Sequence, residues 1–238
     1  IDFDWEHISE VTAEIRKLRL QGLAEIIVKL RKALDLAGLS CKTVSYTPRY
    51  NAFFPFNGST TIQSQPKIIV PHNTNAEGLD LVKYIDASQF KTNPKKAAQD
   101  IISYCGLMMY DISAQDAFNA AHNPSISNAF SMQHYIDTLQ SWVSPGLFKK
   151  TQVVMGFEPG PNAATGVWGG IPLSKSVTDY IKLYNYGGVM FWALNDINKC
   201  PKPTSPGGTR CDPSVGNTRT TGENSLCLAK YAAGGTCS

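Results

Sequence analysis

The stretch IDFDWE, residues 1–6, alternates large apolar side chains with the three acids Asp2, Asp4 and Glu6. Residues two apart in a strand lie on one face of a sheet, so the stretch predicts a strand with three carboxylates on one face and apolar groups on the other. Like charges a few ångströms apart do not all ionise easily. We therefore expect the acids to share a proton inside the fold and the pKa of Glu6, the outermost acid, to be raised, as a general acid requires.

The chain up to residue 196 alternates short apolar strands with amphipathic helices. The strands are apolar at nearly every position, which is typical of parallel strands buried on both faces. We expect strands at 41–48, 106–113, 151–159 and 187–196, and helices at 25–36, 94–104, 131–143 and 174–186. In the first of these helices Ile26 and Ile27 fall on one apolar stripe and Gly38 follows as the C-cap, while Ser174 is the expected cap of the last. The alternation predicts an α/β protein with right-handed crossovers.

Each expected strand ends in polar or aromatic side chains that could form a site. These residues are Asp4 and Glu6, then Tyr46, then Tyr110 and Asp111, then Glu158, then Trp192 and Asn195. The active site of a (β/α)8 TIM barrel lies at the carboxyl ends of its strands, so the pattern favours that fold. The rival is an open doubly wound sheet, which more usually has a glycine-rich phosphate turn after its first strand. The sequence has no such turn there.

The composition narrows the class of protein. The chain has 238 residues, of which 42% are hydrophobic and 17% charged, and a net charge of +3. This charge is too small to indicate a nucleic-acid partner, and no apolar run reaches the roughly 18 residues that span a bilayer. We expect no nucleic-acid or membrane partner and a monomer.

The six cysteines indicate disulfides and secretion rather than a metal site. Four lie in the tail, at 200, 211, 227 and 237, without a CxxC pair or nearby histidines. The shortest loops result from the pairs Cys200–Cys211 and Cys227–Cys237, although three pairings are open. We also expect a Cys41–Cys105 bridge, because each cysteine stands near the start of neighbouring strands. The sequon at Asn57 agrees with secretion. No cofactor or metal is expected.

The domain organisation follows from the number of strands. Residues 1–198 hold five strands, whereas a barrel has eight strands in about 250 residues. We therefore expect the C-terminal portion of a catalytic barrel, from about strand four to strand eight, without an N-terminal segment of about 100 residues. The region at about 48–93 is too long for a plain connection and is expected to be an insertion. The tail, 199–238, is Cys-rich and has room for one last barrel helix at about 224–233.

The acidic stretch resembles the DxxDxDxE signature of family 18 glycoside hydrolases, the chitinase-type (β/α)8 barrels, which carry it on the fourth strand. Asp2, Asp4 and Glu6 match its last three acids, and the first would lie two positions before Ile1. GLMMYDIS and GGVMFWALND look like the sixth and eighth strands, and CKTVSYTP and TQVVMGFEPG fall where the fifth and seventh would be. The resemblance covers nearly all of residues 1–195, but the region 48–93 and Glu158 match no pattern of the family.

The resemblance implies retaining hydrolysis of β-1,4-linked N-acetylglucosamine without a protein nucleophile. Glu6 would protonate the glycosidic oxygen, and the 2-acetamido oxygen of the substrate would attack the anomeric carbon. This family is an exception to the rule of two carboxylates. Asp4 would hold the acetamido N–H and share a proton with Asp2.

Other residues would bind the sugar. Tyr110 would donate a hydrogen bond to the acetamido oxygen, Asp111 would contact the sugar, and Trp192 would stack under its ring. Taken alone, Tyr110 and Trp192 fit core positions better; their places at strand ends beside the acidic strand favour the site. Tyr46, Glu158 and Asn195 are candidate subsite residues for which ordinary structural roles stay open.

Three functions remain at this point. A secreted chitinase-type hydrolase acting on chitin or GlcNAc-containing oligosaccharides ranks first, because Glu6 is present. An endo-β-N-acetylglucosaminidase acting on N-glycans shares the motif. A catalytically silent lectin or inhibitor on the same fold is the competing class, since fold does not fix function.

Overall fold

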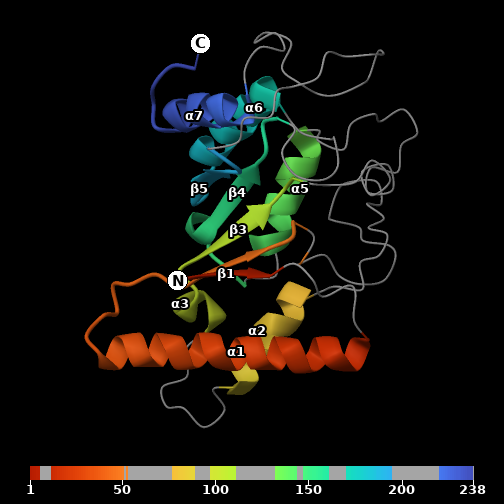
Figure 1. Ribbon diagram of the computed structural model, residues 1–238, viewed down its shortest axis with the longest axis vertical. Coiled ribbons are helices and arrows are strands. Elements are labelled where there is room, and N and C mark those ends of the chain that lie inside the picture. The colour runs from red at the N-terminus through yellow and green to blue at the C-terminus, as the bar shows by residue number, and fades with distance from the viewer. Residues whose placement is uncertain are drawn as a thin grey trace.

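The computed structural model describes residues 1–5, 12–50, 52, 77–88, 97–110, 132–143, 147–160, 170–194 and 220–237. It is a mixed α/β structure with a five-stranded parallel sheet (Figure 1). The strands are β1 (Asp2–Trp5), β2 (Ser45–Pro48), β3 (Tyr104–Met108), β4 (Val153–Phe157) and β5 (Gly188–Phe191). They lie in the sheet in the order in which they occur in the chain, and every neighbouring pair is parallel.

The register of the strands sorts their side chains into two faces. Asp2 pairs with Ser45 and Asp4 with Thr47, so these side chains share a face, which we call the acidic face. It continues across the sheet through Gly106, Gly156 and Met190. The opposite face, which we call the helix face, carries Phe3, Tyr46, Cys105, Leu107, Val153, Met155, Phe157 and Phe191.

The helices supply the other half of the core. They are α1 (Ala13–Leu36), α2 (Glu77–Ser88), α3 (Ala98–Ile101), α5 (Met132–Val143), α6 (Gly170–Leu183) and α7 (Thr221–Ala232), with a 3-10 turn, η1 (Lys150–Gln152), before β4. One buried cluster joins the helix face to α1, α2, α3, α5 and α6, and its largest members include Tyr46, Tyr135, Trp142 and Phe157. The core therefore lies between the helices and the face opposite the acids.

Helix α1 is longer than predicted and buries a different stripe. It begins at Ala13, where the Thr12 side chain accepts a hydrogen bond from the Ile15 amide, and it ends before Gly38, whose φ of 71° suits a residue that follows a helix. Leu20, Leu23, Ala24 and Ile27 are buried, whereas Ile26, which was expected to be buried, is 55% exposed. Ile26 points about 100° away from Ile27 around the helix and falls outside the buried stripe.

One further helix prediction needs correction. Ser174 does not cap α6: it lies one turn inside the helix, and its hydroxyl donates a hydrogen bond of 2.7 Å to the Gly170 carbonyl. Helix α2, for which no helix was expected from the sequence, lies within the region predicted as an insertion and packs against α1. The tail helix is confirmed as α7, with Thr220 as its N-cap and Glu223 completing a capping box.

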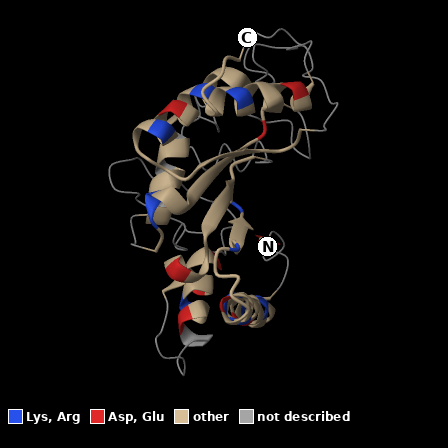
Figure 2. Cartoon of the chain, turned by 90° about the vertical axis from the view of Figure 1, so that its left-hand side faces the viewer, with Lys and Arg blue, Asp and Glu red and all other residues tan. Residues whose placement is uncertain are grey.

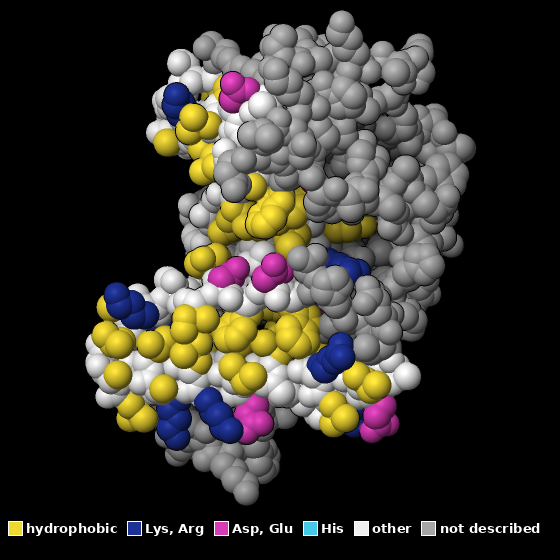
Figure 3. Space-filling view, in the orientation of Figure 1, with side chains coloured by type: hydrophobic (Ala, Val, Ile, Leu, Met, Phe, Trp, Pro, Cys, Tyr) yellow, Lys and Arg dark blue, Asp and Glu magenta, His cyan; other side chains and the backbone are white. Residues whose placement is uncertain are grey.

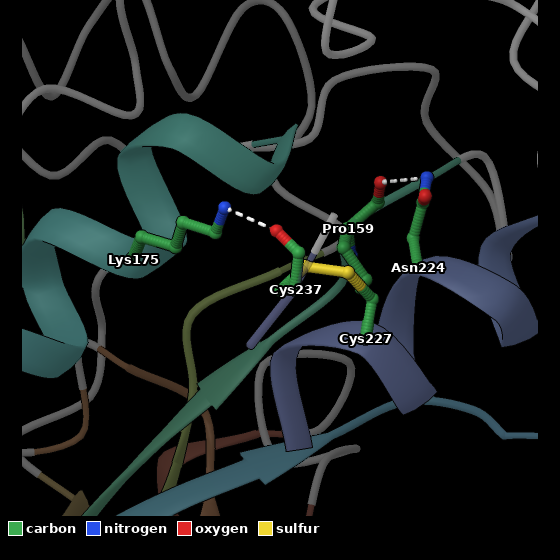
Figure 4. The surroundings of a disulfide bond; sticks show 5 residues. All are labelled: Pro159, Lys175, Asn224, Cys227 and Cys237. Carbon is green, nitrogen blue, oxygen red and sulfur yellow. Dashed lines mark hydrogen bonds between the residues drawn. A yellow bond between two sulfur atoms is a disulfide. The ribbon is translucent and has the colours of Figure 1, made fainter. Parts of the chain in front are cut away.

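The cysteines confirm one predicted disulfide and contradict another. Cys227 in α7 is bonded to Cys237 (Figure 4). Cys41 and Cys105 are both free. Cys105 lies inside β3 with its side chain in the core, and Cys41 is exposed in the turn before β2, so the two thiols occupy different environments. Cys200 and Cys211 lie outside the described residues.

Candidate functional site

The carboxylates of β1 lie side by side on the acidic face, as the alternation of residues predicted. Asp2 and Asp4 are both exposed, so the expectation that they are buried inside the fold is not met in the described structure. Figure 3 shows acidic side chains over β1, with apolar side chains above them and along α1 below. The first acid is held by two hydroxyls from β2: Ser45 donates to Asp2 Oδ1 over 2.6 Å and Thr47 over 2.9 Å.

Two strand glycines give the acidic face its shape. A methyl group on Gly106 would lie 2.8 Å from Thr47 Oγ1 and 3.1 Å from Met190 Cε. A methyl group on Gly156 would lie 2.8 Å from Met190 Cε and 2.9 Å from Tyr110 Cε1. A larger residue at either position would therefore force these side chains to move, and at Gly156 it would also meet the Leu107 carbonyl oxygen at 2.5 Å. The space above the two glycines is filled by Thr47, Met190 and Tyr110, which brings Tyr110 to the same face as Asp2.

Trp192 and Glu158 stand at the carboxyl ends of neighbouring strands. The Trp192 amide donates a hydrogen bond of 3.0 Å to the Phe157 carbonyl, which holds the end of β5 against β4. The Trp192 side chain is 52% exposed, and its peptide bond to Ala193 is cis. Glu158 directly follows β4 and is only 3% exposed. An exposed indole offers a flat face to a ligand, whereas Glu158 is covered in this arrangement.

Tyr46 does not lie with the acids. It pairs with Phe3 and Cys105 on the helix face and is completely buried. Burial raises the pKa of its hydroxyl well above the ordinary value of 10.0, and the charge of Glu77 adds to the effect. Among the described residues the hydroxyl has no hydrogen-bond partner. The structure therefore places Tyr46 in the core and away from the acidic face.

Three predicted site residues cannot be placed. Glu6 directly follows β1, Asp111 follows Tyr110, and Asn195 follows Leu194; all three lie outside the described residues. The site that can be built therefore consists of Asp2 and Asp4 with Tyr110 nearby and Trp192 at the end of β5.

Sequence reasoning missed several residues of this face, namely Ser45, Thr47, Gly106, Gly156 and Met190. A signal was present for the glycines, since a glycine inside a strand often marks a close approach of another group. The alternation Ser45-Tyr46-Thr47 also placed two small hydroxyl residues two apart, on one face of a strand.

A buried carboxyl group lies on the other side of the sheet. Glu77, the first residue of α2, is 2% exposed, and neither of its oxygens has a hydrogen-bond partner among the described residues. Burial raises its pKa from 4.5 to about 7, while the charges of Arg49 and Arg16 act in the opposite direction. This carboxyl group is near Tyr46 rather than the acidic face, so we assign it to stability and not to the site.

The charged surface of the described residues does not indicate a further site (Figure 2). Figure 2 shows basic and acidic residues interspersed along the helices. The described residues contain no group of three or more His, Cys, Asp or Glu side chains that could hold a metal ion. No helix in the described part of the chain is long and apolar enough to cross a membrane.

Comparisons with protein-family models, curated proteins and solved structures found no match to this chain. The class that the fold defines is thus an α/β protein with a parallel sheet, helices packed on one face and paired carboxylates on the other.

Proposed function

We propose that this protein is a secreted glycoside hydrolase of the family 18, chitinase type, which cleaves β-1,4-linked N-acetylglucosamine polymers with retention by substrate-assisted catalysis. The observation that carries the proposal is the pair Asp2 and Asp4, side by side on the acidic face with Tyr110 close to the same face. An exposed Trp192 at the end of β5 supplies an aromatic surface of the kind that stacks on a sugar ring.

The architecture supports a (β/α)8 barrel as the complete fold. A barrel adds its strands in chain order and keeps all of its helices outside, whereas a doubly wound sheet reverses its strand order and has helices on both faces. The observed order β1 to β5 and the packing of the described helices on the helix face agree with the barrel. Further strands would then join the sheet beside β1 and β5.

Helix α1 gives independent support for a neighbouring strand–helix unit. Ile15, Leu18 and Ile26 are 43%, 59% and 55% exposed, although α1 already buries another stripe in the core. Helices of a barrel are also covered on their flanks by the helices before and after them. Residues 1–198 would thus form the C-terminal portion of the barrel, and 199–238 its tail.

The proposed mechanism assigns one task to each carboxyl group. Glu6 protonates the glycosidic oxygen. The 2-acetamido oxygen of the substrate, and not a protein side chain, is the nucleophile that attacks the anomeric carbon. Asp4 accepts a hydrogen bond from the acetamido N–H and stabilises the positive charge that develops on the group. Asp2 shares a proton with Asp4. Ser45 and Thr47 both donate to Asp2 Oδ1 and so hold this side chain on the acidic face.

The sugar would be bound by residues of the neighbouring strands. Tyr110 donates a hydrogen bond to the acetamido oxygen, Asp111 contacts the sugar, and Trp192 stacks under its ring. Asn195 and Glu158 are weaker candidates. Glu158 is only 3% exposed, so it can contact a ligand only if the residues that cover it move. The Cys227–Cys237 disulfide supports an oxidising, extracellular location.

Two other functions use the same features. An endo-β-N-acetylglucosaminidase would need the same acetamido-binding acids and act on N-glycans. A catalytically silent lectin or inhibitor would keep Trp192 as its sugar platform without using Glu6.

A substrate screen separates these functions. The protein is incubated with chitin oligomers, a high-mannose glycopeptide and cellulose oligomers, with Glu6→Gln as the matched variant. We expect cleavage of chitin oligomers alone, lost by at least about 100-fold in Glu6→Gln. Cleavage of the glycopeptide alone would favour the N-glycan enzyme, binding of chitin oligomers without cleavage would favour the lectin, and cleavage of cellulose oligomers would overturn the mechanism.

A further inference from the structure

The Met190 side chain extends from β5 across the acidic face toward β4 and β3. Met190 lies in register with Gly156 of β4, and its side chain is partly exposed. Its Cε lies 2.8 Å from the point that a Cβ on Gly156 would occupy. It lies 3.1 Å from the point that a Cβ on Gly106 would occupy, and the Met190 sulfur lies 3.2 Å from that second point. One flexible side chain therefore spans two neighbouring strands, β4 and β3, above the glycines.

The neighbours of this methyl group are the residues of the proposed site. Tyr110 Cε1 lies 2.9 Å from the same point above Gly156, so the Tyr110 ring and the Met190 methyl group approach the same place above this glycine. Thr47 Oγ1 lies 2.8 Å from the corresponding point above Gly106, and it donates a hydrogen bond to Asp2. Met190 thus approaches the same two points as the tyrosine and the hydroxyl that holds the first acid.

We infer that Met190 is a positioning residue of the site: its thioether fills the space above Gly106 and Gly156 and thereby fixes the Tyr110 ring and the Thr47–Asp2 hydrogen bond. The inference rests on the proposed function, which takes Tyr110 and Asp2 as site residues. Glycines leave a gap at these two positions, and packed side chains hold their places only while neighbouring gaps are filled.

The chemistry of methionine suits this position. Methionine is unbranched and polarisable, fills irregular spaces and makes favourable contacts with aromatic rings. A β-branched residue ends closer to its own strand and would not reach across β4 to β3. Leucine has nearly the volume of methionine and is the conservative replacement, whereas alanine removes the sulfur and methyl group of Met190 from above the glycines.

The test compares Met190→Ala with Met190→Leu in the full chain, with kcat and KM measured on a chitin oligomer and folding checked by thermal melting. We expect Met190→Ala to lower kcat by about 10- to 100-fold with a smaller change in KM, because a misplaced tyrosine harms the chemical step more than binding. Met190→Leu should keep most of the activity. A folded Met190→Ala that keeps the kcat of the wild type would overturn the inference.

A second readout does not depend on activity. With 3-fluorotyrosine incorporated at position 110, the ¹⁹F resonance reports the environment of the ring. We expect it to move toward the position of an exposed fluorotyrosine in Met190→Ala and to stay near its original position in Met190→Leu. If the wild type cleaves no chitin oligomer but the resonance behaves in this way, the proposed function fails and the positioning role of Met190 stands. A resonance that is the same in the wild type and Met190→Ala overturns that role.

Discussion

The free energy of unfolding of the wild type should fall as the pH rises and Glu77 ionises, and Glu77→Gln should abolish this decrease. Glu77 is 2% exposed and its pKa is raised by burial from 4.5 to about 7. Three groups face it: Tyr46 from β2, Arg16 from α1 and Arg49 after β2. The charge of Glu77 raises the pKa of Tyr46 further. Glutamine has nearly the same shape and stays neutral at every pH.

The sign and size follow from the linkage between protonation and folding. A carboxyl group whose pKa is higher in the folded than in the unfolded protein favours folding while it is protonated, and this contribution is lost as the pH rises from 4.5 to about 7. One pKa unit corresponds to about 1.4 kcal/mol, so the shift amounts to about 3 kcal/mol. Most of this difference, about 2–3 kcal/mol, should appear between pH 5 and pH 8.

The assay is urea unfolding of the wild type and of Glu77→Gln at pH 5 and pH 8. We expect the free energy of unfolding of Glu77→Gln, relative to the wild type, to rise by about 2 kcal/mol or more between the two pH values. The matched control is Glu25→Gln, because Glu25 is exposed on α1 beside Lys29 and should show little change. An equal stability difference at pH 5 and pH 8 would refute the reasoning.

Three further changes test the fold. Gly156→Ala should destabilise the protein by at least about 1 kcal/mol in thermal unfolding, because the added methyl group would meet the Leu107 carbonyl oxygen at 2.5 Å. Gly22→Ala is the control and should not destabilise the protein, because the space around Gly22 is open. Cys227→Ser should cost about 2–3 kcal/mol, since the disulfide closes a loop with a sequence separation of 10, and a matched loss on reduction of the wild type would confirm the cause. Arg31→Met should cost about 2–4 kcal/mol in urea, because the buried guanidinium donates to the Lys42 carbonyl over 2.7 Å and pairs with an aspartate of its own helix; an unchanged midpoint would contradict this.

Local patterns in the sequence predicted the order of the elements well. The five strands occur near the predicted positions, although β2 begins only at Ser45 and β3 already begins at Tyr104, which was predicted to end the preceding helix. The shared face of Asp2 and Asp4 was predictable because the two-residue period of a strand depends on no other part of the chain. Helix α2 was missed because it follows a region rich in proline and asparagine that carries no helical signal.

Properties that depend on contacts between distant segments were not predictable. The face on which Tyr46 lies depends on the register of β2 against β1, and a shift by one residue would have placed it with the acids. The Cys41–Cys105 prediction was wrong for a similar reason, because the sequence gives the order of the strands but not the exposure of a turn. The place of Met190 above two glycines requires the positions of three strands at once.

The most direct test of the central claim is a ¹H NMR time course of the anomers released from a chitin hexamer. Attack by the 2-acetamido group followed by attack of water gives two inversions, so we expect the β-anomer to appear first and to convert to the α-anomer by mutarotation. Asp4→Asn, which removes the charged partner of the acetamido group, should slow the release strongly. Initial release of the α-anomer, or release at the wild-type rate by Asp4→Asn, would contradict the account.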